Sequence, residues 1–373
     1  MAAGRDATCR CGRITQNGDT YSFNYGASYL RRDGAIPVYD PELPLRRGLI
    51  EPAAGLSMAS CIRDGSPDAW GRRVIINRLV GARAAEANDI TELTYLLESG
   101  SDRIGALDFQ HSATEYVPRL KAEASYEELL EAAERIEKGA PLTPALDQAL
   151  NHGTSIGGAR PKALVDNGDH KMIAKFSSST DLYSVVKAEF IAMKLAATGK
   201  DVLLIERFDR IKSEDGWQRR AMVSALTMLG LDEMMARYAS YEDLAEIIRH
   251  RFTEPKETLR ELYGRIVFNI LCGNTDDHAR NHAAFWDGHS HRLTPAYDIA
   301  PQRRTSREAG QAMLLADGSR AAQLRNVAAI APVFGVDEPQ FDRIVDRLVG
   351  TIKDFWVDVC DEARLSRKER EAF

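Results

Sequence analysis

The sequence contains no apolar run long enough to cross a membrane or to form the core of a signal peptide. Its first residues, Met1–Asp6, end in a charged pair, and no such run follows them. These absences argue against a membrane partner. We therefore expect a protein that stays in the cytoplasm, where it is made.

Positive charge is not in excess either. The chain has 49 Lys and Arg residues against 55 Asp and Glu residues, which gives a formal net charge of -6. A protein that mainly coats nucleic acid needs a surplus of positive charge. We therefore do not expect phosphate backbones to be the main ligand of this chain.

Cysteines are few, and their number is odd: the chain has five, with no repeated spacing. The pairs Cys9–Cys11 and His289–His291 could each supply half of a metal site, but no second pair at ligand spacing completes either one. This pattern favours reduced thiols in a cytosol over a disulfide framework or a structural zinc site.

The sequence also lacks internal repeats and low-complexity tracts. It has 373 residues, of which 44% are hydrophobic and 28% charged, a composition typical of a globular protein with two or three packed units. Breakers and periodicity divide it into a small α/β region (1–113), a region with a charged helix followed by strands around a second helix (114–221), and a mostly helical region (222–373).

Individual elements can be predicted from the same patterns. Helices are expected over residues 69–79, 90–97, 125–138 and 185–196, and strands over 171–176 and 203–210. In the last region, apolar residues with helical spacing run from Leu259 to Ile270 and from Phe341 to Phe355.

The strongest chemical signal is the segment Gly273–Asn281, GNTDDHARN. Asp276 and Asn281 have the D-x-x-x-x-N spacing of a kinase catalytic loop, in which the Asp accepts the substrate hydroxyl proton and the Asn binds Mg²⁺. The spacing alone is weak evidence, since both residue types are common in turns. His278 lies between them, and we expect it to form hydrogen bonds within the loop, because Mg²⁺ rarely binds imidazole.

A second segment, PAYDIAP, strengthens the kinase interpretation. It places Asp298 seventeen positions after Asn281. Together these two residues offer the hard oxygen ligands that Mg²⁺ prefers. The alternative for Asp298 is a helix cap or a turn.

A glycine-rich segment precedes the central strands. Gly153–Lys162, GTSIGGARPK, has small residues that let backbone N–H groups approach phosphates, with Lys162 nearby to neutralise charge. It is not a Walker motif, because Lys162 is followed by Ala163. A flexible turn is the alternative.

Two further features fit nucleotide binding. Lys175 ends a predicted strand and Glu189 lies on the following helix, as in the Lys–Glu ion pair of kinases, although such residues are often surface charges. The segment Leu203–Arg210, LLIERFDR, could form a hinge whose backbone at Glu206 and Phe208 faces adenine; an edge strand with solvated charges is the alternative.

In this order, these elements resemble the HipA family of toxin kinases from type II toxin–antitoxin modules. Ser66–Arg72, SPDAWGR, is similar to the family's LPDGWGR stretch, and Asp102–Leu107 is similar to its RxGAL segment. Ser66 and Ala69 depart from the family pattern. The resemblance implies an α+β, bilobal protein-kinase-like fold with an N-terminal α/β subdomain, a mixed N-lobe and a mostly helical C-lobe.

The resemblance also implies roles for single residues. Asp276 would be the catalytic base, Asn281 and Asp298 the Mg²⁺ ligands, and Glu189 the structural partner of a lysine. Ser155, or alternatively Thr154, would be autophosphorylated, which would switch the kinase off by charge repulsion. The residues expected to bind ATP are Ser155, Ile156, Gly157, Gly158, Lys162, Lys175, Glu206, Phe208 and His278.

Partners follow from the resemblance as well. A HipB-like helix-turn-helix antitoxin is implied, with DNA bound only indirectly through it. The implied substrate is a translation component such as an aminoacyl-tRNA synthetase, and the basic segment after Asp298, QRRTSR, could contact it. A small-molecule kinase and a catalytically silent corepressor are the alternatives.

Overall fold

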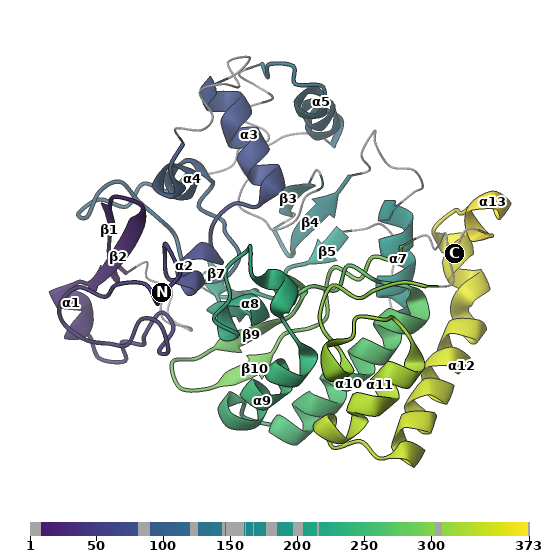
Figure 1. The fold of residues 1–373 in the computed structure, drawn as a ribbon. Coiled ribbons are helices and arrows are strands. Elements are labelled where there is room, and N and C mark those ends of the chain that lie inside the picture. The colour runs from purple at the N-terminus through teal and green to yellow at the C-terminus, as the bar shows by residue number, and fades with distance from the viewer. Residues whose placement is uncertain are drawn as a thin grey trace. The chain divides into compact units, whose positions relative to one another are not determined.

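The computed structural model describes residues 9–80, 90–119, 126–143, 146, 160, 162–166, 168–176, 185–196, 204–214, 216–302 and 308–371. The chain forms two compact units. Unit 1 comprises residues 1–181, 204–222 and 286–289, and unit 2 comprises residues 182–203, 223–285 and 290–373. Both contain helices and strands, so the architecture is mixed α/β (Figure 1).

Unit 1 begins with an antiparallel hairpin. Strands β1 (Gly12–Asn17) and β2 (Thr20–Tyr25) are joined at Gly18, whose positive φ of 60° suits a tight turn. Tyr21, Phe23 and Tyr25 alternate along β2 and are all buried, as expected for a strand with one face on the core.

Five helices, a second sheet and a second hairpin make up the rest of the described part of unit 1. The helices that follow the hairpin are α1 (Ala27–Leu30), α2 (Ser60–Arg63), α3 (Ala69–Val80) and α4 (Glu92–Glu98). After α5 (Tyr126–Glu137) come β3 (Lys162–Asp166), β4 (Lys171–Lys175) and β5 (Leu204–Glu206), an antiparallel sheet in the order β3-β4-β5. Strands β6 (Arg210–Ser213) and β7 (Gly216–Arg219) form a separate hairpin.

One apolar cluster joins these pieces of unit 1. Trp70 and Val74 of α3 pack with Ala132 and Ile136 of α5 and with Ala163 of β3. The predicted helices over 69–79, 90–97 and 125–138 are thereby confirmed within the described residues, with ends displaced by one or two positions.

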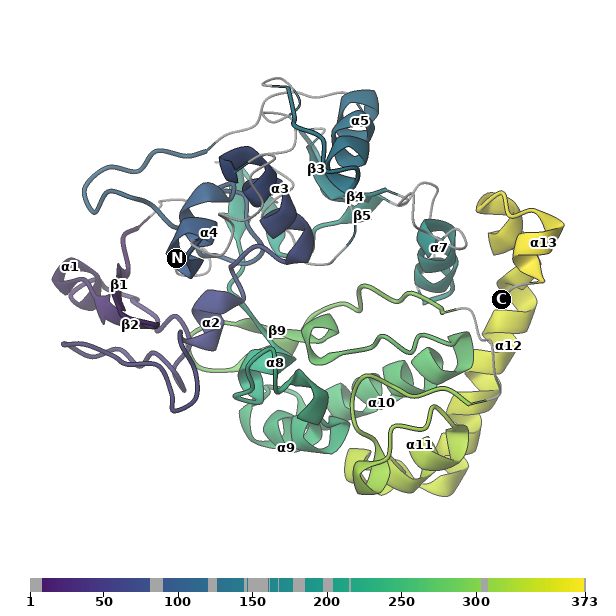
Figure 2. The same cartoon turned by 45° about the horizontal axis from the view of Figure 1, so that its top comes forward.

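Unit 2 is built around a long buried helix. Helix α10 (Pro255–Cys272) contacts α9 (Tyr241–Arg251), α11 (Leu324–Ile330) and α12 (Glu338–Glu362), and Figures 1 and 2 show it between α9 and α12. Helix α7 (Val185–Ala196) packs on α12, and the short helices α8 (Ala225–Met228) and α13 (Arg367–Arg370) complete the set. The helices predicted from Leu259 and from Phe341 are therefore confirmed.

One expectation needs correction, and one needs a detail added. The single strand predicted over 203–210 is wrong: β5 ends at Glu206 and β6 begins at Arg210, because the side chains between them turn inward to a buried charge cluster described below. The region after residue 222 is mostly helical, as predicted, but strands are present in it as well. It contains most of a three-stranded sheet, β10-β9-β8, formed by β8 (Met222–Ser224), β9 (Ala283–Trp286) and β10 (His291–Leu293).

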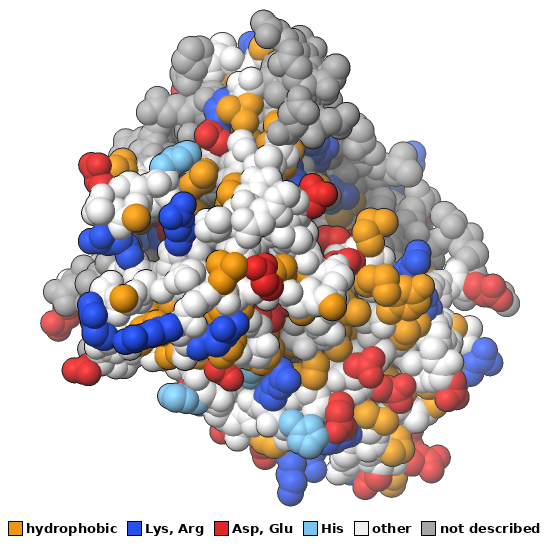
Figure 3. Space-filling view, turned by 60° about the vertical axis from the view of Figure 1, so that its left-hand side comes forward, with side chains coloured by type: hydrophobic (Ala, Val, Ile, Leu, Met, Phe, Trp, Pro, Cys, Tyr) orange, Lys and Arg blue, Asp and Glu red, His pale blue; other side chains and the backbone are white. Residues whose placement is uncertain are grey.

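Surface features agree with the charge balance of the sequence. Figure 3 shows acidic and basic side chains interspersed over the face that it presents. Within the described residues, no helix is both long and apolar enough to span a membrane. All five cysteines belong to the described residues, and none of them forms a disulfide.

Candidate active site

The candidate catalytic loop begins where α10 ends. The apolar face of α10 is buried, so the helix is fixed in the core of unit 2. Gly273 follows it in the left-handed region with φ at 76°, and the N–H of Asn274 donates to the carbonyl of Asn269 at 2.8 Å. This glycine-based ending turns the chain sharply out of the helix and into the loop.

Backbone and side-chain hydrogen bonds define the shape of the loop. The N–H of His278 donates to the carbonyl of Asp276 at 2.9 Å, and the N–H of Asn281 donates to the carbonyl of His278 at 2.8 Å. The side-chain Nδ2 of Asn281 also donates to the carbonyl of Asp276, at 3.1 Å. The amide oxygen of Asn281 takes no part in this bond, and it is the atom of the amide that can accept a bond or bind a cation.

Two hydrogen bonds hold the Asp298 segment against this loop. The hydroxyl of Tyr297 donates to the carbonyl of Arg280 at 2.6 Å, and the N–H of Gln302 donates to the carbonyl of Gly273 at 2.9 Å. Asp298 lies between these two bonds. The structure therefore brings the segment of Asp298 to both ends of the loop that carries Asp276 and Asn281.

The two carboxylates of this site differ in environment. Asp276 is exposed, whereas Asp298 is half-buried and has φ at 58°, in the left-handed region. An aspartate tolerates this conformation better than most residues, but it is still uncommon. Such a backbone persists when its surroundings hold it, and here the flanking bonds of Tyr297 and Gln302 do so.

Three buried polar residues, Tyr241, Asp277 and His282, form hydrogen bonds that hold the loop. Asp277 accepts hydrogen bonds from the hydroxyl of Tyr241 and, at 2.9 Å, from Nε2 of His282. Burial opposes the ionised form of Asp277, but the interactions with His282 and Tyr241 outweigh it and lower its pKa. Burial, together with the nearby Asp277 charge, raises the pKa of Tyr241. Neither Asp277 nor Tyr241 was among the residues predicted from the sequence.

His278 lies within the loop, as expected from its position. Its Nδ1 is buried and has no hydrogen-bond partner within the described residues, and the same holds for Nδ1 of His282. A buried imidazole nitrogen without a partner is uncommon in a folded protein. At His278 it leaves a polar atom that can meet a ligand.

In unit 1, Lys162 and Lys175 face each other across β3 and β4. Only 2% of Lys162 is exposed, and its ammonium lies 3.4 Å from the Asp68 carboxylate. Burial raises the pKa of Asp68, and the charge of Lys162 opposes that rise. Asp68 also accepts a 3.0 Å hydrogen bond from the N–H of Gly71 in the first turn of α3. Asp68, which belongs to the SPDAWGR segment, therefore links this helix to strand β3.

The proposed hinge includes the end of β5 and the residues directly after it. Glu206 pairs with Met172 of β4 through the backbone, and its exposed carboxylate lies 2.9 Å from Nδ1 of His170. The N–H of Arg207 donates to the carbonyl of Lys171 at 2.8 Å, which keeps the chain against β4 beyond the end of β5. Phe208 follows and is half-buried.

The alternative of solvated charges in this segment is wrong for its arginines and for Asp209. Arg207 makes two bonds to the Asp209 carboxylate, at 3.0 and 2.8 Å, and lies 3.0 Å from Asp102. Arg210 contacts the same two carboxylates, at 2.7 and 2.8 Å. We call Asp102, Arg207, Asp209 and Arg210 the buried charge cluster.

This cluster explains a motif near the start of the chain. The N–H of Gly105 donates to Asp209 at 2.8 Å, and Gly105 has a positive φ of 75°. The segment after Asp102 and the segment after Glu206 are thus joined within unit 1. The alternating acidic and basic residues from Glu206 to Arg210 were the sequence signal for this cluster. That pattern alone does not show whether the charged side chains are buried.

Several predicted positions lie outside the described residues: Thr154, Ser155, Ile156, Gly157 and Gly158, and the basic positions 303–307. Lys175 belongs to unit 1 and Glu189 to unit 2. Their ion pair stays a prediction, as do the region boundaries at 113 and 221.

Comparison with known proteins identifies two matching families. Residues 7–110 match a family profile described as HipA N-terminal domain, and residues 154–356 match one described as HipA-like C-terminal domain. Among solved structures, the HipA–HipB–operator DNA complex of the Shewanella oneidensis toxin–antitoxin system is similar, with a TM-score of 0.70 and 20% identity. The match covers 97% of this chain and 91% of that one.

Curated relatives match over shorter lengths. “Putative kinase Y4mE” of Sinorhizobium fredii is 25% identical over 60% of this chain, and a “Putative kinase” of Haemophilus influenzae is 31% identical over 26% of it. The chain spans 60% of the first relative's length and 29% of the second's.

Proposed function

The chain belongs to the HipA family, and from this premise we propose that it is an ATP- and Mg²⁺-dependent serine/threonine protein kinase, the toxin of a type II toxin–antitoxin module. The observation that carries the proposal is the pair of hydrogen bonds, Tyr297 to Arg280 and Gln302 to Gly273, on either side of Asp298. They bring the segment of Asp298 against the loop of Asp276 and Asn281 in unit 2, which supports the proposal that these residues serve proton transfer and metal binding.

The roles of the loop residues follow from their environments. Asp276 is exposed, so a substrate hydroxyl can reach its carboxylate, which accepts the proton as the oxygen attacks the γ-phosphorus. The trio of Tyr241, Asp277 and His282 fixes the backbone on which Asp276 stands. Positioning of this kind is a large part of phosphoryl-transfer catalysis.

The donor set fits Mg²⁺. Asp298 offers a carboxylate and Asn281 an amide oxygen whose nitrogen is already engaged, and both are the hard ligands that this ion prefers. When bound, Mg²⁺ neutralises charge on the transferred phosphoryl group.

We propose that ATP is bound by the backbone of the glycine-rich segment and by Lys162, Lys175 and His278, and that the backbone of Glu206 and Phe208 contacts the adenine. Glu189 stays the proposed ion-pair partner of Lys175, as in the Lys–Glu pair of kinases. These elements would form the N-lobe and the C-lobe of a bilobal kinase.

The proposed kinase is tested most directly with a matched pair of aspartates. Asp298 and Asp317 both have φ in the left-handed region, at 58° and 51°, but only Asp298 adjoins the loop. We expect Asp298→Asn to abolish phosphate transfer from labelled ATP to protein, and Asp317→Asn to leave it unchanged. Full activity of Asp298→Asn, with thermal unfolding like that of the wild type, would refute the metal-binding role.

Autophosphorylation is proposed at Ser155, with Thr154 as the alternative acceptor. Incubation with Mg²⁺ and ATP should place phosphate on the peptide spanning 153–162, found by mass spectrometry, and Ser155→Ala should remove it and prolong activity. Phosphate on other peptides alone would contradict this switch.

A HipB-like antitoxin is the proposed partner, because the similar Shewanella structure contains HipB and operator DNA. DNA would then be reached only through the antitoxin. The proposed substrate is a translation component such as an aminoacyl-tRNA synthetase. A phosphoproteomic comparison of cells that express the wild type or Asp276→Ala would identify it, and a labelled metabolite without labelled protein would point to a small-molecule kinase.

A further inference from the structure

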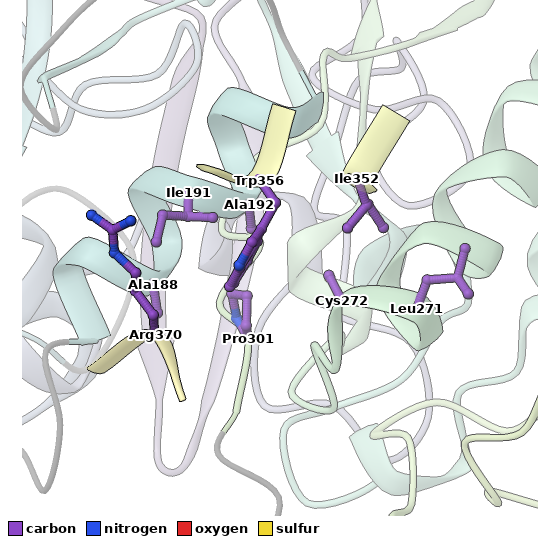
Figure 4. Close-up of a pocket in the computed structure, with 9 residues that line it drawn as sticks. All are labelled: Ala188, Ile191, Ala192, Leu271, Cys272, Pro301, Ile352, Trp356 and Arg370. Carbon is purple, nitrogen blue, oxygen red and sulfur yellow. The ribbon is translucent and has the colours of Figure 1, made fainter. Parts of the chain in front are cut away.

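Unit 2 contains a cavity next to the segments that carry the candidate active site. It has a volume of about 320 Å³, within the range of small-molecule sites. Figure 4 shows α7 side chains on one side and α10 side chains on the other, with Trp356 of α12 and Pro301 between them. The lining residues are Ala188, Ile191, Ala192, Leu271, Cys272, Pro301, Ile352, Trp356 and Arg370.

The lining is apolar except at one point. Among these nine residues, Arg370 is the one that carries a charge. Its Nε donates to the carbonyl of Leu365 at 3.2 Å and its Nη2 to Asp361, and Nη1 makes no hydrogen bond within the described residues. Because the Asp361 side chain is 64% exposed, that ion pair is weak, and a carboxylate in the cavity can compete for the guanidinium.

The cavity is lined by residues next to both segments of the candidate active site, the loop after α10 and the segment of Asp298. Cys272 is the last residue of α10, directly before the loop, and Pro301 precedes Gln302, whose N–H bonds Gly273. Helix α7, which carries Glu189, supplies the opposite wall. A molecule in this cavity therefore contacts the elements that set the positions of the loop and of α7.

We propose that this cavity binds a small carboxylic acid with an apolar body, whose carboxylate pairs with Arg370 and whose apolar part lies against α7, α10 and α12. Bound there, the acid stabilises the arrangement in which Gln302 is bonded to Gly273. The binding itself is independent of the proposed kinase activity, so its test separates the two.

Calorimetric titration of the full chain with octanoate, octanol and octylamine tests the ligand class. Octanoate should bind most tightly. Arg370→Gln should weaken octanoate about tenfold and leave octanol unchanged, as expected for loss of one charged hydrogen-bonding partner. The matched control is Arg367→Gln on the same short helix, since Arg367 is 92% exposed and lies outside the cavity. Equal binding of octanoate and octanol, or full binding to Arg370→Gln, would overturn the proposal.

A second measurement needs no variant. Saturating octanoate should slow alkylation of Cys272 by iodoacetamide, read by mass spectrometry, while Cys9 and Cys11 in unit 1 react as before. Hydrogen exchange at the Gln302 amide should slow in the same samples. Unprotected Cys272 at saturating octanoate would show that the acid binds elsewhere.

Discussion

At the scale of single residues, buried charges fix the positions of functional segments in both units. Asp209 lies between two arginines and the N–H of Gly105, and Asp277 lies between Tyr241 and His282. A buried charge is tolerated only with close partners, and removal of one partner leaves the other desolvated and unpaired. These residues are therefore sensitive positions although none is predicted to touch a substrate.

The first prediction concerns Asp209. Asp209→Asn should lower the free energy of unfolding by about 3 to 5 kcal/mol, because Arg207 and Arg210 then remain buried without that carboxylate. The control is Asp169→Asn, since Asp169 is 78% exposed and its ion pair with Lys212 lies at the surface. Urea unfolding measures both. Similar midpoints for the two variants would show that the buried charge cluster adds little stability.

The second prediction concerns pH. Burial alone would raise the pKa of Asp102, but the charges of Arg207, Arg210 and Lys171 lower it well below its ordinary value. A lowered folded-state pKa gives stability that is complete above the unfolded-state pKa of about 3.9 and is lost as the pH falls below it. Urea midpoints should thus fall steeply in acid for the wild type and less steeply for Asp102→Asn. Parallel pH curves would contradict this.

At the scale of elements, helix α10 connects the core of unit 2 to the candidate catalytic loop. Its apolar face is buried in unit 2, its last residue lines the cavity, and the glycine that ends it also accepts the hydrogen bond from Gln302. A change in how this helix ends should therefore affect the loop more than a change in its middle.

The third prediction compares two glycines, Gly264 within α10 and Gly273 directly after its end. Gly273→Ala should destabilise unit 2 by about 1 to 2 kcal/mol, because φ is 76° there and an L residue is strained in that region. Gly264→Ala, inside the helix with open space around the added Cβ, should instead stabilise by about 0.5 to 1 kcal/mol. Thermal unfolding distinguishes the two signs. Kinase activity should fall only in Gly273→Ala.

At the scale of the whole molecule, the proposed antitoxin complex and the proposed chemistry depend on different features. The proposed catalytic carboxylate, that of Asp276, is one exposed side chain, whereas a protein interface spreads over many residues.

The fourth prediction follows from this difference. Asp276→Asn should lower phosphate transfer by about 10² to 10⁴ fold, the usual contribution of a general base, and leave binding of a HipB-like antitoxin unchanged. Co-purification and size-exclusion chromatography with the co-expressed antitoxin measure the binding. Loss of the complex in this variant would show that Asp276 serves the interface instead of the chemistry.

Sequence alone identified the family, and it predicted the order of the main elements and the candidate site residues Asp276, Asn281 and Asp298, because local periodicity and motif spacing are properties of the chain itself. Tertiary structure alone revealed the burial of Arg207, Asp209 and Arg210. It also placed Asp277 on Tyr241 and His282 and enclosed the cavity beside Cys272. Each of these depends on contacts between residues far apart in the chain, and whether a charge is solvated or buried is decided only when those distant segments pack.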